Sequence, residues 1–271
     1  MEQSEIQQAA KKYTIFGNPV KHSKSPNMQN AGLKEIGVDG LYDKTHLTDG
    51  EQIKQTFLDK ELTGANITVP HKEIAFRQAD EVRGLAQKIG AVNTYINEDG
   101  KVIAYNTDAP GFLMAMEEYG EIKKALIFGA GGTAKAIAVG LKEKGIDVSI
   151  LNRSEGRLGF FKELDCSTFT WEDFKIDKFD ILINTTTAGL NDTNYPAPLE
   201  IVEALIKDTS AAMDCVYGKQ TPFLELASKY SVANKDGEDM LLYQGVLALE
   251  YFTNKKSDKK VISAMRNGLK S

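Results

Sequence analysis

A glycine-rich turn near the middle of the chain carries the strongest chemical signal in the sequence. The apolar run 125–128 leads directly into Gly129-Ala130-Gly131-Gly132-Thr133-Ala134, and a second apolar run, 148–151, follows about 20 residues later. This order of strand, glycine turn, helix and strand is typical of a dinucleotide site. Gly129 would permit the tight turn, Gly131 would let backbone N–H groups approach a pyrophosphate, and the small Ala134 would let the helix lie close to the strand.

The residues after the second apolar run indicate which dinucleotide binds. A carboxylate at this position accepts a hydrogen bond from a ribose hydroxyl of NAD, but this chain has Arg153 there, with Arg157 one turn later. A guanidinium can make paired, charge-assisted hydrogen bonds to a 2′-phosphate. The alternative is that Arg153 is an ordinary surface arginine. Its position after the second strand favours NADP as the cofactor.

Polar segments also follow predicted strands in the first part of the chain, at the edge where open parallel sheets bind ligands. They are residues 17–26, 64–72, 90–94 and 105–111. In the first of them, Ser23 and Ser25 could each donate to a small anion at the start of a helix. The alternative is that Ser25 is only the N-cap of a helix with Pro26 at its first position. In the second, strand alternation places Asn66 and Thr68 on one face.

A lysine and an aspartate in these segments could move a proton. Lys72 follows the strand predicted over 65–69 and would lie in the first turn of a helix, where the macrodipole disfavours a cation. That position suits a proton-transfer group, although most lysines are solvated surface charges. Asp108 could be only a helix cap. If the two side chains faced each other, their opposite charges would hold both in position.

Composition limits the class of protein. A chain of 271 residues is expected to form two domains, and 42% hydrophobic with 26% charged residues is ordinary for a soluble protein. No apolar stretch is long enough to cross a bilayer, and a net charge of -5 gives no general attraction to nucleic acid. Two cysteines and three dispersed histidines predict neither a disulfide framework nor a metal site. Residues 1–8 lack the features of a secretory signal, so we expect a cytoplasmic protein.

Hydrophobic periodicity predicts alternating strands and helices throughout the chain. The predicted strands are 13–16, 41–47, 65–69, 125–128, 148–151, 180–184 and 211–215, with a hairpin turn at 97–100. The predicted helices are one that starts at Pro26, an amphipathic one over 53–58 and one that ends at about 89, then 107–119, 133–144, 155–164, 221–230, 238–252 and 258–269. Small polar residues at 184–190 and 214–218 could line a nicotinamide pocket or be plain turns.

The motifs, in this order, resemble the shikimate dehydrogenase family from about Tyr13 to the C-terminus. The matching features are serines 23 and 25, segments 66–72, 91–94 and 106–108, the glycine loop, residues 152–153, the turn 184–189, Tyr217, and segment 237–244. The resemblance implies an α/β protein of two domains with a cleft between them. An N-terminal α/β substrate domain would span 1–106 and be completed by helices in 239–271. A Rossmann-type, doubly wound NADP-binding domain would span 107–238.

The resemblance also implies the activity, which is NADP-dependent, reversible reduction of 3-dehydroshikimate to shikimate by hydride transfer, in the pathway to aromatic amino acids. The implied catalytic residues are Lys72 and its partner Asp108, and the protein would be a monomer or homodimer. The implied substrate-binding residues are Ser23, Ser25, Asn66, Thr68, Asn93, Asp108, Tyr217 and Gln244, with Tyr217 near the nicotinamide. The implied cofactor-binding residues are Gly129, Ala130, Gly131, Gly132, Thr133, Asn152, Arg153, Ser154, Arg157, Thr185, Thr186, Cys215 and Gly237.

Two alternatives remain at this point, a quinate/shikimate dehydrogenase that uses NAD and a non-catalytic family member that binds a cofactor and regulates. Serine at both 23 and 25, together with Arg153, disfavours the first, and the presence of both Lys72 and Asp108 disfavours the second. Helical spacing adds an expectation for Gln244, which would lie in the middle of a buried stripe. The stripe would consist of Met240, Gln244, Leu247, Ala248 and Tyr251. The glutamine amide would then bind either a core partner or, as we favour, a substrate hydroxyl.

Overall fold

The computed structural model describes residues 10–271, so the prediction for residues 1–8 lies outside the described residues. The chain forms two compact units. Unit 1 contains the described residues up to Ala86, Gly90–Tyr105 and Gly245–Ser271, and unit 2 contains Gln87–Ile89 and Asn106–Gln244. The division falls between 105 and 106 and between 244 and 245, where sequence analysis placed it after 106 and after 238. The second division lies inside a helix, α10 (Glu238–Thr253).

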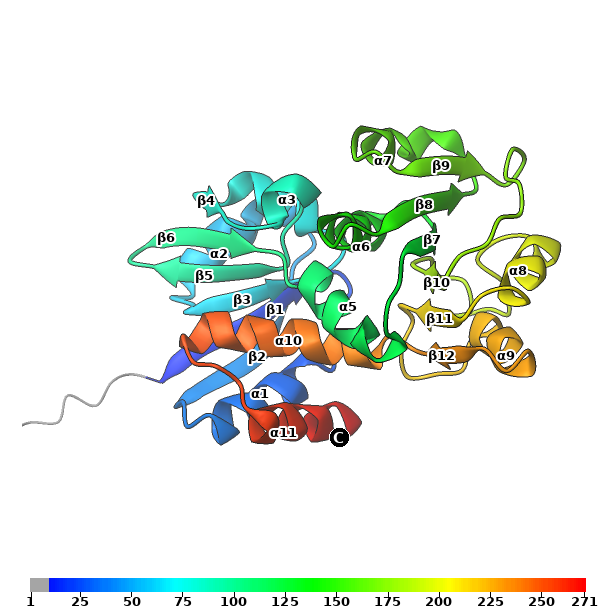
Figure 1. The fold of residues 1–271 in the computed structure, drawn as a ribbon. Coiled ribbons are helices and arrows are strands. Elements are labelled where there is room, and N and C mark those ends of the chain that lie inside the picture. The colour runs from blue at the N-terminus through cyan, green and yellow to red at the C-terminus, as the bar shows by residue number, and fades with distance from the viewer. Residues whose placement is uncertain (1–9) are drawn as a thin grey trace, which may run out of the picture. The chain divides into compact units, whose positions relative to one another are not determined.

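Unit 1 is built on a six-stranded mixed sheet with strand order β2-β1-β3-β5-β6-β4 (Figure 1). The strands are β1 (Lys11–Gly17), β2 (Gly40–His46), β3 (Gly64–Ile67), β4 (Glu81–Val82), β5 (Thr94–Glu98) and β6 (Lys101–Tyr105). β1 pairs in parallel with β2 and β3, whereas β5 is antiparallel to β3 and β6. The helices are α1 (Ser25–Glu35), α2 (Ile53–Asp59), α3 (Lys72–Gln78), α11 (Lys259–Lys270) and the part of α10 from Gly245 onward. The short α4 (Ala86–Ile89) is divided between the two units.

Apolar side chains cover both faces of this sheet. On one face, Phe16 and Ala65 pack with Phe57 of α2. On the other face, the ring of Phe252 in α10 lies 5.1 Å from the ring of Tyr13 and 6.2 Å from that of Tyr42. Helices α1 and α11 lie side by side, and an added Cβ at Gly268 would approach the backbone oxygen of Asn27 to 2.6 Å (Figure 1). The sheet of unit 1 therefore lies between two apolar layers.

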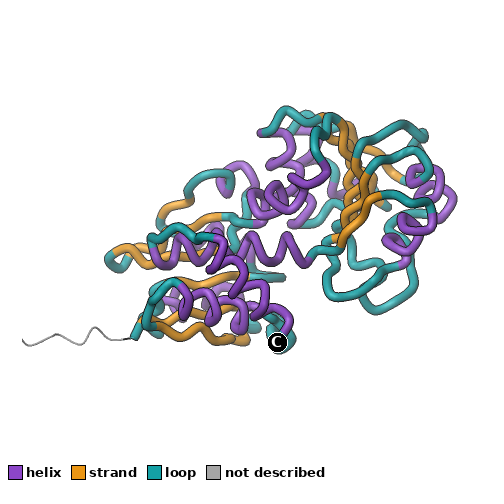
Figure 2. The backbone as a smooth tube through the Cα atoms, turned by 60° about the horizontal axis from the view of Figure 1, so that its bottom comes forward, coloured by secondary structure: helices purple, strands orange, loops and turns teal. Residues whose placement is uncertain are grey.

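Unit 2 is a doubly wound parallel sheet with strand order β12-β11-β10-β7-β8-β9, whose strands lie side by side in Figure 2. The strands are β7 (Lys124–Phe128), β8 (Asp147–Asn152), β9 (Ser167–Thr170), β10 (Ile181–Asn184), β11 (Ala211–Asp214) and β12 (Ala233–Lys235). The helices are α5 (Asp108–Met116), α6 (Gly132–Glu143), α7 (Gly159–Glu163), α8 (Leu199–Ile206) and α9 (Pro222–Lys229). The strand order reverses between β7 and β10, which is where sheets of this kind bind nucleotides. The predicted fold class is therefore confirmed.

Local departures from the predicted elements have identifiable causes. The single helix predicted to end near 89 stops at Gln78, because Asp80 and Val102 exchange hydrogen bonds that begin strand β4. Gly84, with φ of +64°, then turns the chain before α4. The helix predicted over 155–164 begins as a 3-10 turn, Glu155–Arg157, before α7. Sequence analysis missed β9, α8 and β12. No helix in residues 10–271 is long and apolar enough to span a membrane.

Candidate functional site

The polar segments of unit 1 meet at the carboxyl ends of β1 and β3. The Thr68 N–H donates to the Phe16 oxygen at 2.9 Å, just beyond the paired part of the two strands. An added Cβ at Gly17 would lie 2.4 Å from Cγ2 of Thr68. Only glycine permits this approach, so Gly17 brings the serine-containing loop and the Thr68 segment together.

The serine loop leads into α1 in a way that differs from the predicted N-cap. Ser25 is the first helical residue and Lys24 occupies the N-cap position without a side-chain capping bond. The prediction that Ser25 caps the helix is therefore wrong by one position, because the helix starts earlier than Pro26 indicated. Ser25 is 6% exposed, and its N–H donates to Oγ of Ser23 at 3.2 Å. The two serines are thus tied to each other at the start of the helix.

Lys72 is the first residue of α3, as predicted, and it is half-buried. Its backbone oxygen accepts a hydrogen bond from the Val92 N–H at 3.0 Å, while the Ile67 N–H donates to the Asn93 oxygen at 2.8 Å. Both bonds join the end of β3 and the start of α3 to the segment before β5. The structure therefore brings Thr68, Lys72 and Asn93 to one edge of the sheet of unit 1.

Asp108 is the first residue of α5 in unit 2, Thr107 occupies the N-cap position, and the side chain of Asn106 supplies the acceptor for the first N–H groups. Oδ1 of Asn106 accepts from the N–H groups of Asp108 and Ala109 at 3.0 and 3.4 Å. The alternative in which Asp108 is only a cap is therefore wrong. Asp108 is 7% exposed. The Asp108 carboxylate therefore lies in the first turn of α5 without serving as its N-cap.

Gln244 lies close to α5 in the same unit. An added Cβ at Gly111 would lie 2.6 Å from the backbone nitrogen of Gln244, so glycine sets the close approach of α5 and α10. The Gln244 side chain is half-buried, and its Nε2 donates to the Leu241 oxygen of its own helix at 2.8 Å. The predicted buried stripe is only partly confirmed, because Met240 and Ala248 are buried but Tyr251 is 43% exposed. The other buried apolar residues of α10 are Leu242, Val246, Leu249 and Phe252.

The glycine loop lies at the reversal point of the sheet of unit 2. Gly129 has φ of +98°, and an added Cβ there would lie 2.9 Å from Oγ1 of Thr185. Both the N–H and the hydroxyl of Thr185 donate to the Phe128 oxygen. In contrast, a Cβ at Gly131 or Gly132 would meet no atom within 4 Å. The loop is therefore fixed on its inner side and open above the N-terminus of α6, which fits a bound pyrophosphate.

Two arginines follow β8, as the sequence predicts. Arg153 and Arg157 are exposed, and within residues 10–271 neither guanidinium makes an ion pair or hydrogen bond. The nearby Glu155 is paired with Lys162 at 2.9 Å. The Asn152 amide donates to the Ser154 oxygen at 2.8 Å and shapes the turn that carries Arg153. This turn therefore offers positive charge without a competing carboxylate partner, which fits a 2′-phosphate.

A buried carboxylate that sequence analysis did not single out braces the ends of β10 and β11. Asp214 is 1% exposed and accepts from the Asn184 amide at 3.0 and 3.1 Å, the Thr221 hydroxyl at 2.7 Å and the Val216 N–H at 2.9 Å. Burial raises the pKa of Asp214, and these hydrogen bonds oppose the rise. Oδ1 of Asn184 in turn accepts from the N–H and hydroxyl of Thr186. The signal in the sequence that could have identified Asp214 is its position as an aspartate at the end of an apolar strand.

The last predicted cofactor residues lie beside this brace. An added Cβ at Gly237 would lie 2.5 Å from the Cys215 oxygen, so only glycine fits there. Asp236 accepts from the Gly218 N–H at 2.7 Å and thereby fixes the loop that carries Tyr217. Tyr217 is 38% exposed, and burial raises its pKa. Within residues 10–271, no three His, Cys, Asp or Glu side chains are arranged to hold a metal ion.

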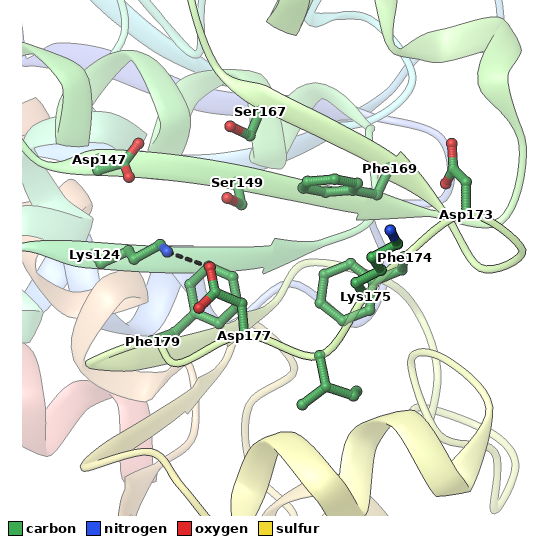
Figure 3. A pocket seen from close by; sticks show the side chains of 11 residues that line it. Lys124, Asp147, Ser149, Ser167, Phe169, Asp173, Phe174, Lys175, Asp177 and Phe179 are labelled. Carbon is green, nitrogen blue, oxygen red and sulfur yellow. Dashed lines mark hydrogen bonds and ion pairs between the residues drawn. The ribbon is translucent and has the colours of Figure 1, made fainter.

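A separate pocket of about 470 Å³ lies on unit 2 and is drawn in Figure 3. It is lined by side chains from β7, β8, β9 and the following loop, including Ser149 and Phe169. Nζ of Lys124 lies 2.5 Å from a carboxylate oxygen of Asp177 and over the ring of Phe179, so this ammonium group already has an ion-pair and a cation–π partner. None of the predicted site residues lines this pocket.

Comparison with known proteins agrees with the fold and the motifs. A family model described as the shikimate dehydrogenase substrate binding domain matches residues 15–95. A shikimate dehydrogenase (NADP(+)) of Helicobacter hepaticus is 43% identical over 256 residues, which is 94% of this chain and 95% of the relative.

Solved structures are also similar over nearly the whole chain. The shikimate 5-dehydrogenase of Thermus thermophilus in complex with NADP(H) and shikimate has a TM-score of 0.85 and 33% identity, covering 96% of this chain and 98% of that one. The Listeria monocytogenes enzyme in complex with shikimate and NAD has a TM-score of 0.84 and 27% identity, with 98% of both chains covered. The fold and glycine loop define a dinucleotide-binding α/β protein of two units. Within that class, the chain belongs to the shikimate dehydrogenase family.

Proposed function

We propose that this protein catalyses the NADP-dependent, reversible reduction of 3-dehydroshikimate to shikimate, a step on the route to aromatic amino acids. The observation that carries the proposal is the 43% identity, over 94% of the chain, to a relative named shikimate dehydrogenase (NADP(+)). The exposed Arg153 and Arg157, with the open backbone at Gly131 and Gly132, support NADP as the cofactor.

NADP supplies the hydride acceptor or donor when it is bound. In this proposal, Lys72 takes the hydroxyl proton as shikimate is oxidised and returns it in the reductive direction, with Asp108 as its partner. Ser23, Ser25 and Asn93 hydrogen-bond the substrate together with Thr68, Tyr217 and Gln244. Backbone N–H groups of Gly131–Thr133 hold the pyrophosphate at the start of α6. The arginines after β8 bind the 2′-phosphate through charge-assisted hydrogen bonds.

The test is a spectrophotometric assay of all four pairings of shikimate or quinate with NADP or NAD. We expect shikimate with NADP to give the highest kcat/KM. NAD is the second candidate, because a structural neighbour was solved with shikimate and NAD. Equal efficiency with both cofactors would refute NADP preference, and preferred oxidation of quinate would refute the substrate assignment. No turnover with any pairing would favour the non-catalytic alternative.

We further propose that the protein acts in the cytoplasm as a monomer or homodimer. The two cysteines, Cys166 and Cys215, are free, which is consistent with a reducing compartment. Light scattering coupled to size-exclusion chromatography decides between the two assemblies against the chain mass of 29.8 kDa. A mass above that of a dimer would contradict this part of the proposal.

A further inference from the structure

A chain of buried side-chain hydrogen bonds crosses the sheet of unit 1 and ends at Asn93. The Tyr42 hydroxyl donates to Oδ1 of Asn66 at 2.7 Å. Nδ2 of Asn66 donates to the Asn93 backbone oxygen at 3.1 Å and to Oγ1 of Thr94 at 3.2 Å. The Thr94 hydroxyl then donates to Oδ1 of Asn93 at 2.9 Å. All four residues are at most 6% exposed, so protein groups rather than bulk water orient these polar atoms.

The donors and acceptors in this chain have one consistent direction. Burial raises the pKa of Tyr42 well above its ordinary value, so its hydroxyl stays protonated and able to donate. Asn66 therefore turns its oxygen to Tyr42 and both amide hydrogens toward the Asn93 segment. Thr94 has a single hydroxyl hydrogen, and because the hydroxyl accepts from Asn66, that hydrogen goes to Asn93. The oxygen of the Asn93 amide is thereby fixed toward Thr94, and its nitrogen points the other way.

Tyr42, the first residue in this series of hydrogen bonds, is itself held in position by hydrogen bonds. The Tyr42 backbone N–H donates to Oδ1 of Asn30, and Nδ2 of Asn30 donates to the Tyr42 oxygen, both at 2.9 Å. Asn30 lies on α1, the helix that begins with Ser25. Asn66 and Thr94 are direct cross-strand partners in β3 and β5. We call this series of hydrogen bonds through Tyr42, Asn66 and Thr94 the relay. It runs from α1 through three strands to the edge of the sheet that carries Asn93.

We propose that Tyr42, Asn66 and Thr94 are positioning residues that fix the amide orientation of Asn93, so that Asn93 presents N–H rather than C=O to a substrate hydroxyl. The proposal rests on the function proposed above, in which Asn93 binds shikimate. It gives Asn66 a role through Asn93, because its amide hydrogens and its oxygen all have protein partners. Tyr42 lies in none of the sequence motifs, and Thr94 lies in segment 91–94 without a predicted role.

The chain offers a matched pair of tyrosines for the test. Tyr13 and Tyr42 are each 1% exposed and each packs on Phe252, but the Tyr13 hydroxyl is buried without a hydrogen-bond partner among the described residues. Tyr42→Phe should raise the KM for shikimate about five- to tenfold, the usual effect of one lost hydrogen bond, with kcat changed less and the KM for NADP unaltered. Tyr13→Phe should leave all three constants unchanged. Equal effects of the two variants on the KM for shikimate would overturn the relay.

A second pair tests the hydroxyl next to Asn93. Thr94→Val removes the hydroxyl at nearly constant volume and should raise the KM for shikimate by a similar factor, whereas Thr94→Ser should restore it. A lower melting temperature for Thr94→Val with an unchanged KM would mark the hydroxyl as merely structural and overturn the proposal.

A spectroscopic measurement separates this proposal from the proposed function. The side-chain amide signals of Asn93 in a ¹⁵N spectrum, identified by their loss in Asn93→Asp, should move in Tyr42→Phe but not in Tyr13→Phe. If the wild-type protein does not oxidise shikimate, the proposed function fails, and this shift still decides whether the relay orients Asn93. Unmoved Asn93 signals in Tyr42→Phe would overturn the relay whatever the activity.

Discussion

Replacing the buried Asp214 with alanine should destabilise unit 2 and weaken its cofactor site. The substitution leaves three donor groups, from Asn184, Val216 and Thr221, without their acceptor. An orphaned buried donor costs about 1–3 kcal/mol, and the Thr221 hydroxyl can turn elsewhere, so we expect a loss of about 3–5 kcal/mol. At about 2–4 °C per kcal/mol, thermal unfolding should shift down by about 6–20 °C.

The assay is thermal unfolding followed by circular dichroism, with steady-state kinetics at a temperature where the variant is folded. Because Asn184 also holds Thr186, the KM for NADP should rise more than the KM for shikimate. Asp192→Ala is the matched control, since exposed Asp192 also accepts two backbone N–H bonds but water can replace it. An Asp214→Ala protein that melts within about 2 °C of wild type would refute the reasoning.

The raised pKa of Asp214 gives this prediction a pH dependence with a definite sign. In the unfolded chain the carboxyl titrates near its ordinary value of 3.8, and in the folded chain it titrates at higher pH because of burial. Between the two values the folded state holds a proton that the unfolded state has lost, so stability falls as pH rises through this window. Relative to Asp214→Asn, wild type should therefore be most favoured at acid pH. A relative stability that increases from pH 4 upward would contradict this sign.

Three further substitutions test the proposed roles. Lys72→Ala should lower kcat by about 100- to 10,000-fold with a much smaller change in KM, and near-normal turnover in a steady-state assay would show an ordinary surface lysine. Arg153→Asp should weaken NADPH binding by about 1.5–3 kcal/mol in a fluorescence titration, leaving the KM for shikimate unchanged. Gln244→Ala should weaken shikimate binding by about 1–3 kcal/mol with little change in melting temperature, because among residues 10–271 its amide hydrogen-bonds only to its own helix. A large drop in melting temperature with unchanged affinity would make Gln244 structural.

Sequence motifs predicted the fold class and the order of the strands that carry the glycine loop. Gly129 and Arg153 were found because their chemistry depends on neighbours only a few residues away. The break of the helix after Gln78 was missed, because it depends on pairing of Asp80 with Val102, 22 residues further on. The buried stripe of α10 was predicted only in part for a similar reason, since Met240 and Ala248 are buried but Tyr251 is exposed. Helical spacing allows several apolar faces on α10, and only tertiary packing selects the one that contains Leu249.

Residues proposed to contact ligands had local signals in the sequence, whereas the residues that hold those side chains in position did not. Ser25 and Asp108 were ambiguous in the sequence, since each could have capped a helix, and the structure assigns the N-cap positions to Lys24 and Thr107. The buried hydrogen bonds that position these residues had no comparable signal in the neighbouring sequence. Tyr42 reaches Asn66 across 24 residues of sequence, and the amide of Asn184 reaches Asp214 across 30. A buried polar residue of this kind looks like an ordinary strand residue in the sequence, because its partner is defined only by strand order. The positioning of the ligand-facing side chains therefore had to come from the three-dimensional structure.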